Sequence, residues 1–369
     1  MRLLLVSQDF PPETGGIQSY MGHLARHLPG PCEALTVIAP SSDKGDAVLD
    51  TQLPFPVRRI RVHSSWLVMP LLARLPGLVR QTRSTHVLYA QWFPALAGLR
   101  LPASVRQAAI VHGRELLNHP LGATGLRLAT PVLNRLDAVI PNSRYTADLL
   151  PDSVRPERVH VVYPGVDSTL FAPPSATAQE DLRQRLGIAR GTPIVTCLTR
   201  LVSRKGVDTL ITAATHLRAR HPGVQVLVGG NGPDRSRLEA LITHADLGGT
   251  VRLLGRIPDS DLPSFLSLGV FALLSRQEAQ DVEGFGMVLA EAQACGAPVV
   301  AARSGGMPEA VGPGAGLIVP PDDPAAAADA FSTLFDAENA AACSQAGLLH
   351  AATLDWPSRA QAIAQVLRG

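Results

Sequence analysis

The chain has 369 residues, of which 46% are hydrophobic and 17% charged, an ordinary balance for a folded globular protein. This composition excludes a largely disordered chain, and the length exceeds the roughly 250 to 300 residues at which one hydrophobic core stops growing, so two domains are expected. A formal net charge of +2 lacks the basic excess of a nucleic-acid-binding domain, and no nucleic-acid partner is expected.

The apolar runs are too short for a signal peptide or a membrane span. Residues 1–10 hold only a four-residue apolar run, and residues 87–99 are interrupted by Gln91 and Pro94. The cysteines lie far apart, without the spacings of a disulfide framework or a zinc site. They are Cys32, Cys197, Cys295 and Cys343. We therefore expect a cytoplasmic protein, with peripheral contact at the inner membrane face as an open alternative.

Charge is distributed unevenly along the chain. Residues 1–165 hold 17 Lys and Arg against 11 Asp and Glu, whereas residues 166–369 hold 16 against 20. A basic front half would suit an acidic acceptor or an anionic membrane surface. The alternative, that these arginines are scattered solvated side chains, stays open.

Strand-like and helix-like segments alternate from the N-terminus. Each short apolar run is followed by a longer amphipathic or polar segment, the pattern of a parallel sheet with helical crossovers. The expected strands of the first half are residues 3–7, 35–39, 57–62, 86–90, 108–112 and 137–141.

The same rhythm restarts in the second half. Its expected strands are residues 193–198, 224–229, 250–255, 270–275 and 297–302. The sequence therefore predicts an α/β fold of two doubly wound units in tandem.

The boundary between the units is expected in a segment rich in proline and small residues. A strand beginning at Val159 runs into Pro164-Gly165, and we place a hinge within residues 163–180. The expected domains are residues 1–165 and residues 166–354. Residues 355–369, with Asp355 as a helix cap and apolar positions at helical spacing, are expected to form a helix that crosses back to the first domain.

Two glycines follow the first strand. Gly15 and Gly16 precede a predicted helix through His27, where backbone N–H groups can approach an anion at the positive helix end. The pattern is neither GxxxxGK nor GxGxxG, and glycines that serve only a turn explain it equally well.

A histidine ends the fifth expected strand. His112 is followed by Gly113 and Arg114, which places an imidazole at the carboxyl edge of the first sheet, where open α/β sheets bind ligands. A lone histidine is more often structural, so its position favours a function without establishing one.

Basic residues follow the first strand of the second unit. Arg200, Lys205 and Gly206 precede a predicted helix, and the two cations can converge on one doubly charged group. A solvated basic turn is the alternative, but it explains poorly why these residues cluster after a central strand.

The most specific pattern is a pair of glutamates eight residues apart. Glu283 precedes Gly284, Phe285 and Gly286, and Glu291 lies inside the helix that these glycines open. Such a loop can present Glu283 and free N–H groups to a sugar, and Glu291 can accept hydrogen bonds from ribose hydroxyls. Because the helix is otherwise apolar, an uncompensated carboxylate there would be costly.

Two further segments imitate known motifs. Asp259 and Asp261 have the Asp-x-Asp form of a metal–nucleotide site, but they follow Pro258 at the start of a predicted helix, which favours a helix cap. Gly230, in Gly-Asn-Gly-Pro, lacks the third glycine of a dinucleotide fingerprint. We expect it in a turn lining the nucleotide side.

Four of these patterns together resemble glycosyltransferase family four, and they occur in the right order over nearly the whole chain. They are Gly15-Gly16, His112-Gly113, Arg200 with Lys205-Gly206, and the Glu283/Glu291 pair. The segments FPPETGGIQSY, LTRLVSRKG and DVEGFGMVLAEAQACGAPVVA are similar to bacterial phosphatidylinositol mannosyltransferases that use GDP-mannose. One departure is Arg114, which stands where a second histidine is expected and concerns the acceptor.

The resemblance implies the GT-B fold, with two Rossmann-like domains facing across a cleft, and a role for each matching residue. It assigns catalysis to His112, Arg200, Lys205 and Glu283. It assigns donor binding to Gly15, Gly16, Gly230, Arg256, Ile257, Gly284, Phe285, Gly286 and Glu291. It assigns acceptor contacts to Asp9, Gln18 and Arg114.

The implied reaction is transfer of a hexose from a nucleotide diphosphate sugar, with mannose from GDP-mannose favoured, and with retention of anomeric configuration. The acceptor would be a sugar, an inositol or a lipid-linked group. Neither a metal nor a cofactor is expected, because Arg200, Lys205 and backbone amides would stabilise the leaving diphosphate. A monomer or a homodimer is expected.

Other functions remain as alternatives. A nucleotide-sugar epimerase or a phosphorylase can use the same architecture, and a non-catalytic nucleotide-sugar-binding protein would not need the full charged set. A dehydrogenase is disfavoured by the missing fingerprint after the first strand. Residues 66–83 mix apolar and basic side chains and either dock on anionic lipid or form a packed helix with a solvated edge.

Overall fold

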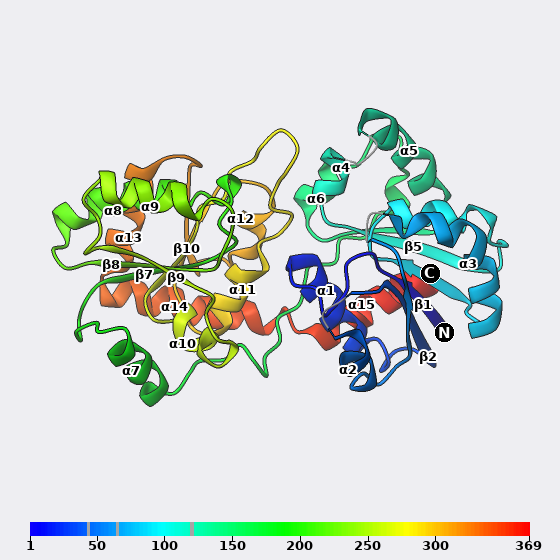
Figure 1. Ribbon diagram of the computed structural model, residues 1–369, viewed down its shortest axis with the longest axis horizontal. Coiled ribbons are helices and arrows are strands. Elements are labelled where there is room, and N and C mark those ends of the chain that lie inside the picture. The colour runs from blue at the N-terminus through cyan, green and yellow to red at the C-terminus, as the bar shows by residue number, and fades with distance from the viewer. Residues whose placement is uncertain (43–44, 64–65, 119–121) are drawn as a thin grey trace. The chain divides into compact units, whose positions relative to one another are not determined.

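The computed structural model describes residues 1–42, 45–63, 66–118 and 122–369, and these divide into two compact units. Unit 1 comprises Met1–Gly165 together with Trp356–Gly369, and unit 2 comprises Val166–Asp355. Each unit is built on its own parallel six-stranded sheet with helices on both faces (Figure 1). None of the helices in the described ranges is long and apolar enough to cross a bilayer.

The sheet of unit 1 has the order β3-β2-β1-β4-β5-β6. Its strands are β1 (Arg2–Val6), β2 (Ala34–Pro40), β3 (Val57–Ile60), β4 (His86–Tyr89), β5 (Arg106–Val111) and β6 (Ala138–Pro141). All six predicted strands of the first half are confirmed. The inner strands β1 and β5 are almost fully buried, as expected where helices cover both faces of a parallel sheet.

Helices cover the two faces of this sheet as separate groups. On one face α1 (Gly16–His27) packs against α15 (Trp356–Arg368), so the last helix of the chain is part of unit 1. On the other face α3 (Val68–Thr82), the 3-10 helix η2 (Phe93–Arg100) and α5 (Gly122–Arg135) pack together. The shorter helices are α2 (Asp46–Thr51), α4 (Arg114–Leu117), α6 (Arg144–Asp148) and η3 (Pro156–Arg158).

The predicted strand from Val159 is wrong in its extent. Val159 makes only an isolated bridge to Val139, although the backbone N–H groups of His160 and Val162 still reach carbonyls of β6. Apolar alternation predicted a strand, but the segment leaves the edge of the sheet because it runs into the connection between the units.

The sheet of unit 2 has the order β12-β11-β10-β7-β8-β9. Its strands are β7 (Ile194–Leu198), β8 (Gln225–Gly229), β9 (Val251–Gly255), β10 (Val270–Leu273), β11 (Val299–Ala302) and β12 (Gly316–Val319). The five predicted strands are confirmed. The sixth, β12, was not predicted, since it is four residues long and begins with a glycine.

Helices also separate into two groups in unit 2 (Figure 1). One face carries α8 (Val207–Arg220), α9 (Arg235–His244) and α13 (Pro324–Leu334); the other carries α7 (Ala176–Arg185), α10 (Leu262–Leu266), α11 (Met287–Ala294) and α14 (Ala337–Ala352). The remaining short elements are η4 (Ser203–Lys205), η5 (Asp259–Asp261) and α12 (Met307–Ala310).

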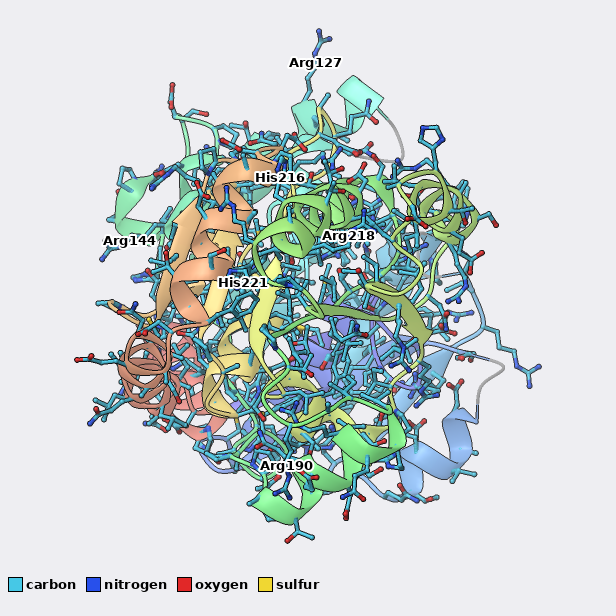
Figure 2. The ribbon with its side chains drawn as sticks, turned by 90° about the vertical axis from the view of Figure 1, so that its left-hand side faces the viewer. Arg127, Arg144, Arg190, His216, Arg218 and His221 are labelled. Atoms are coloured by element: carbon cyan, nitrogen blue, oxygen red, sulfur yellow. The ribbon has the colours of Figure 1, made fainter. Side chains whose placement is uncertain are left out.

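Several basic residues of unit 2 lie near the C-terminal end of α8. His216 and Arg218, with His221 just after the helix, are labelled in Figure 2. Because α8 starts at the carboxyl edge of the sheet, these residues lie toward the amino edge. They therefore belong to the outer surface of the unit and not to a ligand site at the carboxyl edge.

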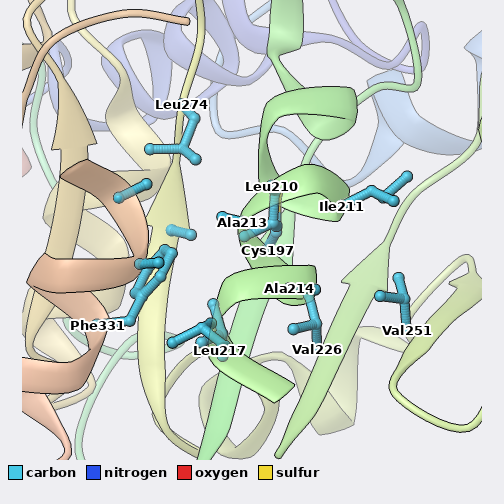
Figure 3. Packing of buried hydrophobic residues seen from close by; sticks show 14 of the residues in the cluster. Cys197, Leu210, Ile211, Ala213, Ala214, Leu217, Val226, Val251, Leu274 and Phe331 are labelled. Atoms are coloured by element: carbon cyan, nitrogen blue, oxygen red, sulfur yellow. The ribbon is translucent and has the colours of Figure 1, made fainter. Parts of the chain in front are cut away.

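The core of unit 2 between the sheet and the α8 face is apolar and close-packed (Figure 3). Leu210 and Leu217 of α8 meet Val226 of β8 and Phe331 of α13 there, each at most 1% exposed. Burying side chains of this size contributes about 1.5 to 3 kcal/mol each. This core supplies the rigid support for the loops that follow the strands.

Candidate functional site

Four loops of unit 2 meet at the carboxyl edge of its sheet. They follow β7, β8, β9 and β10, which are neighbours in the sheet, and ligands of open α/β sheets bind at this edge. A Cβ on Gly230 would lie 1.9 Å from the carbonyl oxygen of Thr199, and the φ of Gly230 is +116°. The loops after β7 and β8 therefore touch through a backbone contact that only glycine permits.

The loop after β7 contacts the loop after β10 through ion pairs. Glu283 Oε2 accepts a hydrogen bond from Arg204 Nη1 at 3.0 Å and another from Lys205 Nζ. Arg204 Nε lies 3.1 Å from Asp281 Oδ2. The side chains of Arg204 and Lys205 are each 14% exposed, and that of Glu283 is 18% exposed. Two cations and two carboxylates thus form one largely buried cluster.

The two cations keep Glu283 ionised. Burial alone would raise its pKa, but the charges of Lys205 and Arg204 outweigh burial and hold the pKa at about 2. Glu283 is therefore an anionic acceptor at neutral pH.

Backbone contacts fix the loops that carry this cluster. Gly306 N–H donates to the carbonyl oxygen of Glu283 at 2.9 Å, and Arg276 N–H donates to the carbonyl oxygen of Arg204 at 2.8 Å. Gly305 has a φ of +58°, and a Cβ there would lie 2.1 Å from the same Glu283 oxygen. The loop after β11 thus supports Glu283 from behind.

The other predicted cations of unit 2 are solvent-facing. Arg200 is exposed, and in the described part of the chain no ion pair or hydrogen bond holds its guanidinium. Arg256 is 81% exposed and lies 3.5 Å from Asp259. Arg200 is thus available to a ligand at this edge, whereas Lys205 is already paired.

Glu291 lies on α11, and Glu283 lies in the loop before this helix. Burial, and next the negative charge of Asp167, raise its pKa to about 7. Near neutral pH this carboxyl is therefore present in both protonation states and can both accept and donate hydrogen bonds.

Four predicted donor-binding residues are buried and help to build the fold of unit 2. Phe285 is 2% exposed, and Ile257 is 9% exposed in a core cluster with Leu227 and Phe265. Gly286, with a φ of +88°, is the N-cap of α11, and Gly284 is buried beside it. Phe285 and Ile257 thus pack inside unit 2 and offer little surface to a ligand.

The prediction that Asp259 and Asp261 cap a helix is wrong in detail. Asp261 stands at the N-cap of α10, but its side chain makes no capping hydrogen bond. Instead its two oxygens accept from Arg185 at 2.8 and 2.9 Å, a bidentate pair that competes with the cap. Among the described residues, no group of three His, Cys, Asp or Glu side chains is placed to hold a metal ion.

In unit 1, His112 is buried just after β5. Its Nε2 lies 2.9 Å from the carbonyl oxygen of Ala90, and its ring meets Tyr20 edge-on at 5.2 Å. Burial lowers the pKa of His112 to about 4. Because a carbonyl can only accept, Nε2 carries the hydrogen of the neutral ring, and Nδ1 is left as an acceptor.

Polar side chains gather after β1 and β4, at the same sheet edge. Asp9 accepts hydrogen bonds from Gln18 at 2.8 Å and from Gln91 at 3.0 Å. Burial raises the pKa of Asp9 above its ordinary value of 3.8. The structure thus brings the predicted Asp9 and Gln18 together and adds Gln91, which sequence reasoning missed.

Glu115 was also missed. Its Oε1 accepts the His112 N–H at 2.6 Å, while its Oε2 is buried without a hydrogen bond. Burial raises the pKa of Glu115 to about 7. The sequence did offer a signal for this contact. Glu115 lies three residues after His112, and a carboxylate at that spacing can accept a hydrogen bond from the backbone N–H across the turn.

Gly16 and Arg114 face solvent at this edge of unit 1. Gly15 is the N-cap of α1, and Gly16 is its first residue. Within the described ranges no atom lies within 4 Å of a Cβ built on Gly16, its chain neighbours and own helix backbone aside. Internal packing therefore does not explain the glycine at position 16.

Two Rossmann-like units, each with a polar carboxyl edge and one with paired glutamates beside a basic loop, define the class of two-domain glycosyltransferases. A family model described as Glycosyl transferases group 1 matches residues 178–348, and one described as Glycosyltransferase Family 4 matches residues 14–170. The chain belongs to this family of glycosyltransferases and is an enzyme.

Relatives match over the whole length. The chain is 36% identical to a GDP-mannose-dependent alpha-(1-6)-phosphatidylinositol monomannoside mannosyltransferase of Mycobacterium tuberculosis, covering 100% of this chain and 98% of that one. The enzyme of the same name from Mycolicibacterium smegmatis is also 36% identical with the same coverage. A D-inositol 3-phosphate glycosyltransferase of Acidothermus cellulolyticus is 28% identical, covering 96% and 86%.

Solved structures confirm the predicted GT-B fold. HepE of Anabaena in complex with UDP superposes with a TM-score of 0.84 at 24% identity, covering 100% of both chains. Sucrose-phosphate synthase of Thermosynechococcus elongatus gives 0.82 at 23% identity, covering 100% of this chain and 98% of that one.

Proposed function

We propose that this glycosyltransferase transfers mannose from GDP-mannose to a phosphatidylinositol mannoside or a related lipid-linked acceptor. The supporting observation is the 36% identity over the whole chain to mycobacterial enzymes whose names give that donor and acceptor. The weaker similarity to inositol phosphate glycosyltransferases is consistent with an inositol-containing acceptor.

In this proposal unit 2 holds the donor. Arg200 and Lys205 bind the diphosphate, and the Glu283 carboxylate accepts hydrogen bonds from the sugar hydroxyls. Glu291 binds the ribose hydroxyls, and Gly284, Gly286 and Gly230 offer backbone groups. Paired cations and backbone amides stabilise the leaving diphosphate as a metal ion would. The expected reaction is therefore metal-independent, and it retains the anomeric configuration.

Unit 1 supplies the acceptor side. The Nδ1 atom of neutral His112 accepts a hydrogen bond from the transferred sugar. Asp9, held by Gln18 and Gln91, is placed to accept hydrogen bonds from acceptor hydroxyls. Arg114, exposed beside them, suits a phosphate of the acceptor better than the neutral imidazole that the resemblance leads us to expect there.

The lipid acceptor implies contact with a membrane. Trp66, just before α3, is 61% exposed, and Met69 in its first turn is 56% exposed. The exposed Arg74, Arg80 and Arg83 lie further along this segment. Exposed apolar side chains can insert into a bilayer interface, and arginines on the same segment are attracted to anionic lipid. A flotation assay tests this: the protein should float with vesicles of phosphatidylinositol but not phosphatidylcholine, and Trp66→Ser with Met69→Ser should abolish flotation.

The proposed reaction is tested with a panel of GDP-, UDP- and ADP-sugars and candidate acceptors. GDP-mannose should release GDP only when a phosphatidylinositol mannoside is present, and the lipid should gain one mannose of retained configuration by NMR. Consumption of donor without acceptor would instead indicate an epimerase, and a requirement for inorganic phosphate would indicate a phosphorylase.

A further inference from the structure

The loop after β7 carries a third cation, Arg204, beside the predicted Arg200 and Lys205. Its guanidinium contacts two carboxylates of the loop after β10, Glu283 at 3.0 Å and Asp281 at 3.1 Å. Lys205 contacts the same oxygen of Glu283 as Arg204 does. One carboxylate oxygen thus has two cationic partners, and one of them is the lysine expected to bind the donor diphosphate.

We infer that Arg204 is a positioning residue: it keeps Glu283 paired while Lys205 leaves Glu283 to bind the diphosphate of the donor. This inference rests on the proposed donor site. In the ligand-free enzyme Lys205 pairs with Glu283, at the place where it would otherwise bind a phosphate. Because Arg204 stays on Glu283, Lys205 can move from Glu283 to the phosphate at a low free-energy cost.

The chemistry of the two cations favours this division. Arginine has a planar fork that holds Glu283 and Asp281 together, so moving Arg204 would break two ion pairs. Lysine is a point charge on a flexible stem, and Lys205 gives up one contact when it turns. The backbone of Arg204 is further held by Arg276 N–H at 2.8 Å.

Burial explains why Glu283 needs a partner that stays. Its side chain is 18% exposed, and a largely buried carboxylate left without a counter-charge is strongly destabilised. With Arg204 in place, Glu283 remains ionised after Lys205 turns away. Without Arg204, Lys205 is the remaining cation on Glu283 and is retained there.

A cycle of variants measures this coupling through GDP, a probe that lacks the sugar Glu283 is proposed to bind. GDP affinity is measured by calorimetry for the wild type, Arg204→Met, Glu283→Gln and the double variant. Arg204→Met should weaken GDP binding at least about tenfold because Lys205 stays on Glu283. Glu283→Gln should bind GDP more tightly than the wild type, and in that background Arg204→Met should have little further effect.

Arg220→Met is the matched control, since Arg220 pairs with Asp329 on the surface of the same unit. It should leave GDP affinity unchanged. If Arg204→Met weakens binding equally with and without Glu283→Gln, Arg204 binds phosphate itself or acts only on the fold, and the inference is overturned. If the wild type binds none of GDP, UDP and ADP, the proposed function fails as well.

Discussion

His112 Nε2 lies 2.9 Å from the carbonyl oxygen of Ala90, at the end of the neighbouring strand of the first sheet. This contact fixes the tautomer, because the carbonyl accepts the hydrogen that Nε2 carries. Burial lowers the pKa of His112 from 6.5 to about 4, so the ring stays neutral in the folded protein at physiological pH. His112 can therefore accept a hydrogen bond at Nδ1 but does not supply a positive charge.

The lowered pKa of His112 predicts a loss of stability in mild acid. The unfolded chain binds a proton at His112 below pH 6.5, whereas the folded chain does not until about pH 4. The free energy of unfolding should therefore fall as pH decreases from about 7 to 5, by about 2 kcal/mol from this residue. Urea titrations at several pH values should show that the free energy of unfolding falls less steeply with decreasing pH in His112→Gln than in the wild type. The same dependence on pH in both proteins would show that the pKa of His112 is not lowered.

Glu115 predicts the opposite pH dependence. Burial raises its pKa from 4.5 to about 7, so the folded protein holds a proton that the unfolded chain has already lost. Its contribution to stability falls as pH rises from about 5 to 8. Glu115→Gln keeps the acceptor for the His112 N–H without this cost, and it should stabilise the protein by about 2 kcal/mol more at pH 8 than at pH 5. Thermal unfolding at both pH values measures the difference.

The fold was largely predictable from the sequence, whereas parts of the site were not. The alternation of apolar and helical segments located eleven strands, because each buried strand of a parallel sheet is a continuous apolar run. Arg204 and Gln91 were missed because their partners, Glu283 and Asp9, lie 79 and 82 residues away. Such pairings depend on which strands are neighbours, and this information is absent from local patterns.

Removing a cation from the donor edge should affect turnover far more than folding. Under the proposed function, Arg200→Ala and Lys205→Ala should each lower turnover about 100- to 1000-fold, since each removes a cation that stabilises the leaving diphosphate. Circular dichroism should show intact folds, and Arg220→Ala serves as the control arginine. Near-normal turnover of both variants would refute their assignment to the diphosphate.

Activity should not require a divalent metal. Asp261, half of the Asp-x-Asp segment, is engaged by Arg185 through both carboxylate oxygens, which leaves it poorly placed as a metal ligand. Turnover should persist in excess EDTA, and Asp261→Asn should leave it within about threefold of the wild type, because removing one ion pair changes stability by only about 1 kcal/mol and no metal ligand is lost. A loss in EDTA that Mg²⁺ or Mn²⁺ restores would contradict the proposal that the reaction is metal-independent.

Gly16 and Gly230 predict opposite outcomes for the same substitution. A Cβ on Gly16 meets open space in the described structure, so Gly16→Ala should leave stability unchanged or slightly higher, as alanine favours the helix. If a phosphate approaches the backbone of α1 there, the added methyl group should nevertheless lower turnover at least about tenfold, as small displacements of a reacting group do. Gly230→Ala, by contrast, places its methyl 1.9 Å from the Thr199 carbonyl at a φ of +116° and should destabilise the fold itself. Melting temperature and turnover, measured together, separate the two cases. A Gly16→Ala variant with full activity would show that no ligand approaches position 16, and the glycine would then serve only the turn.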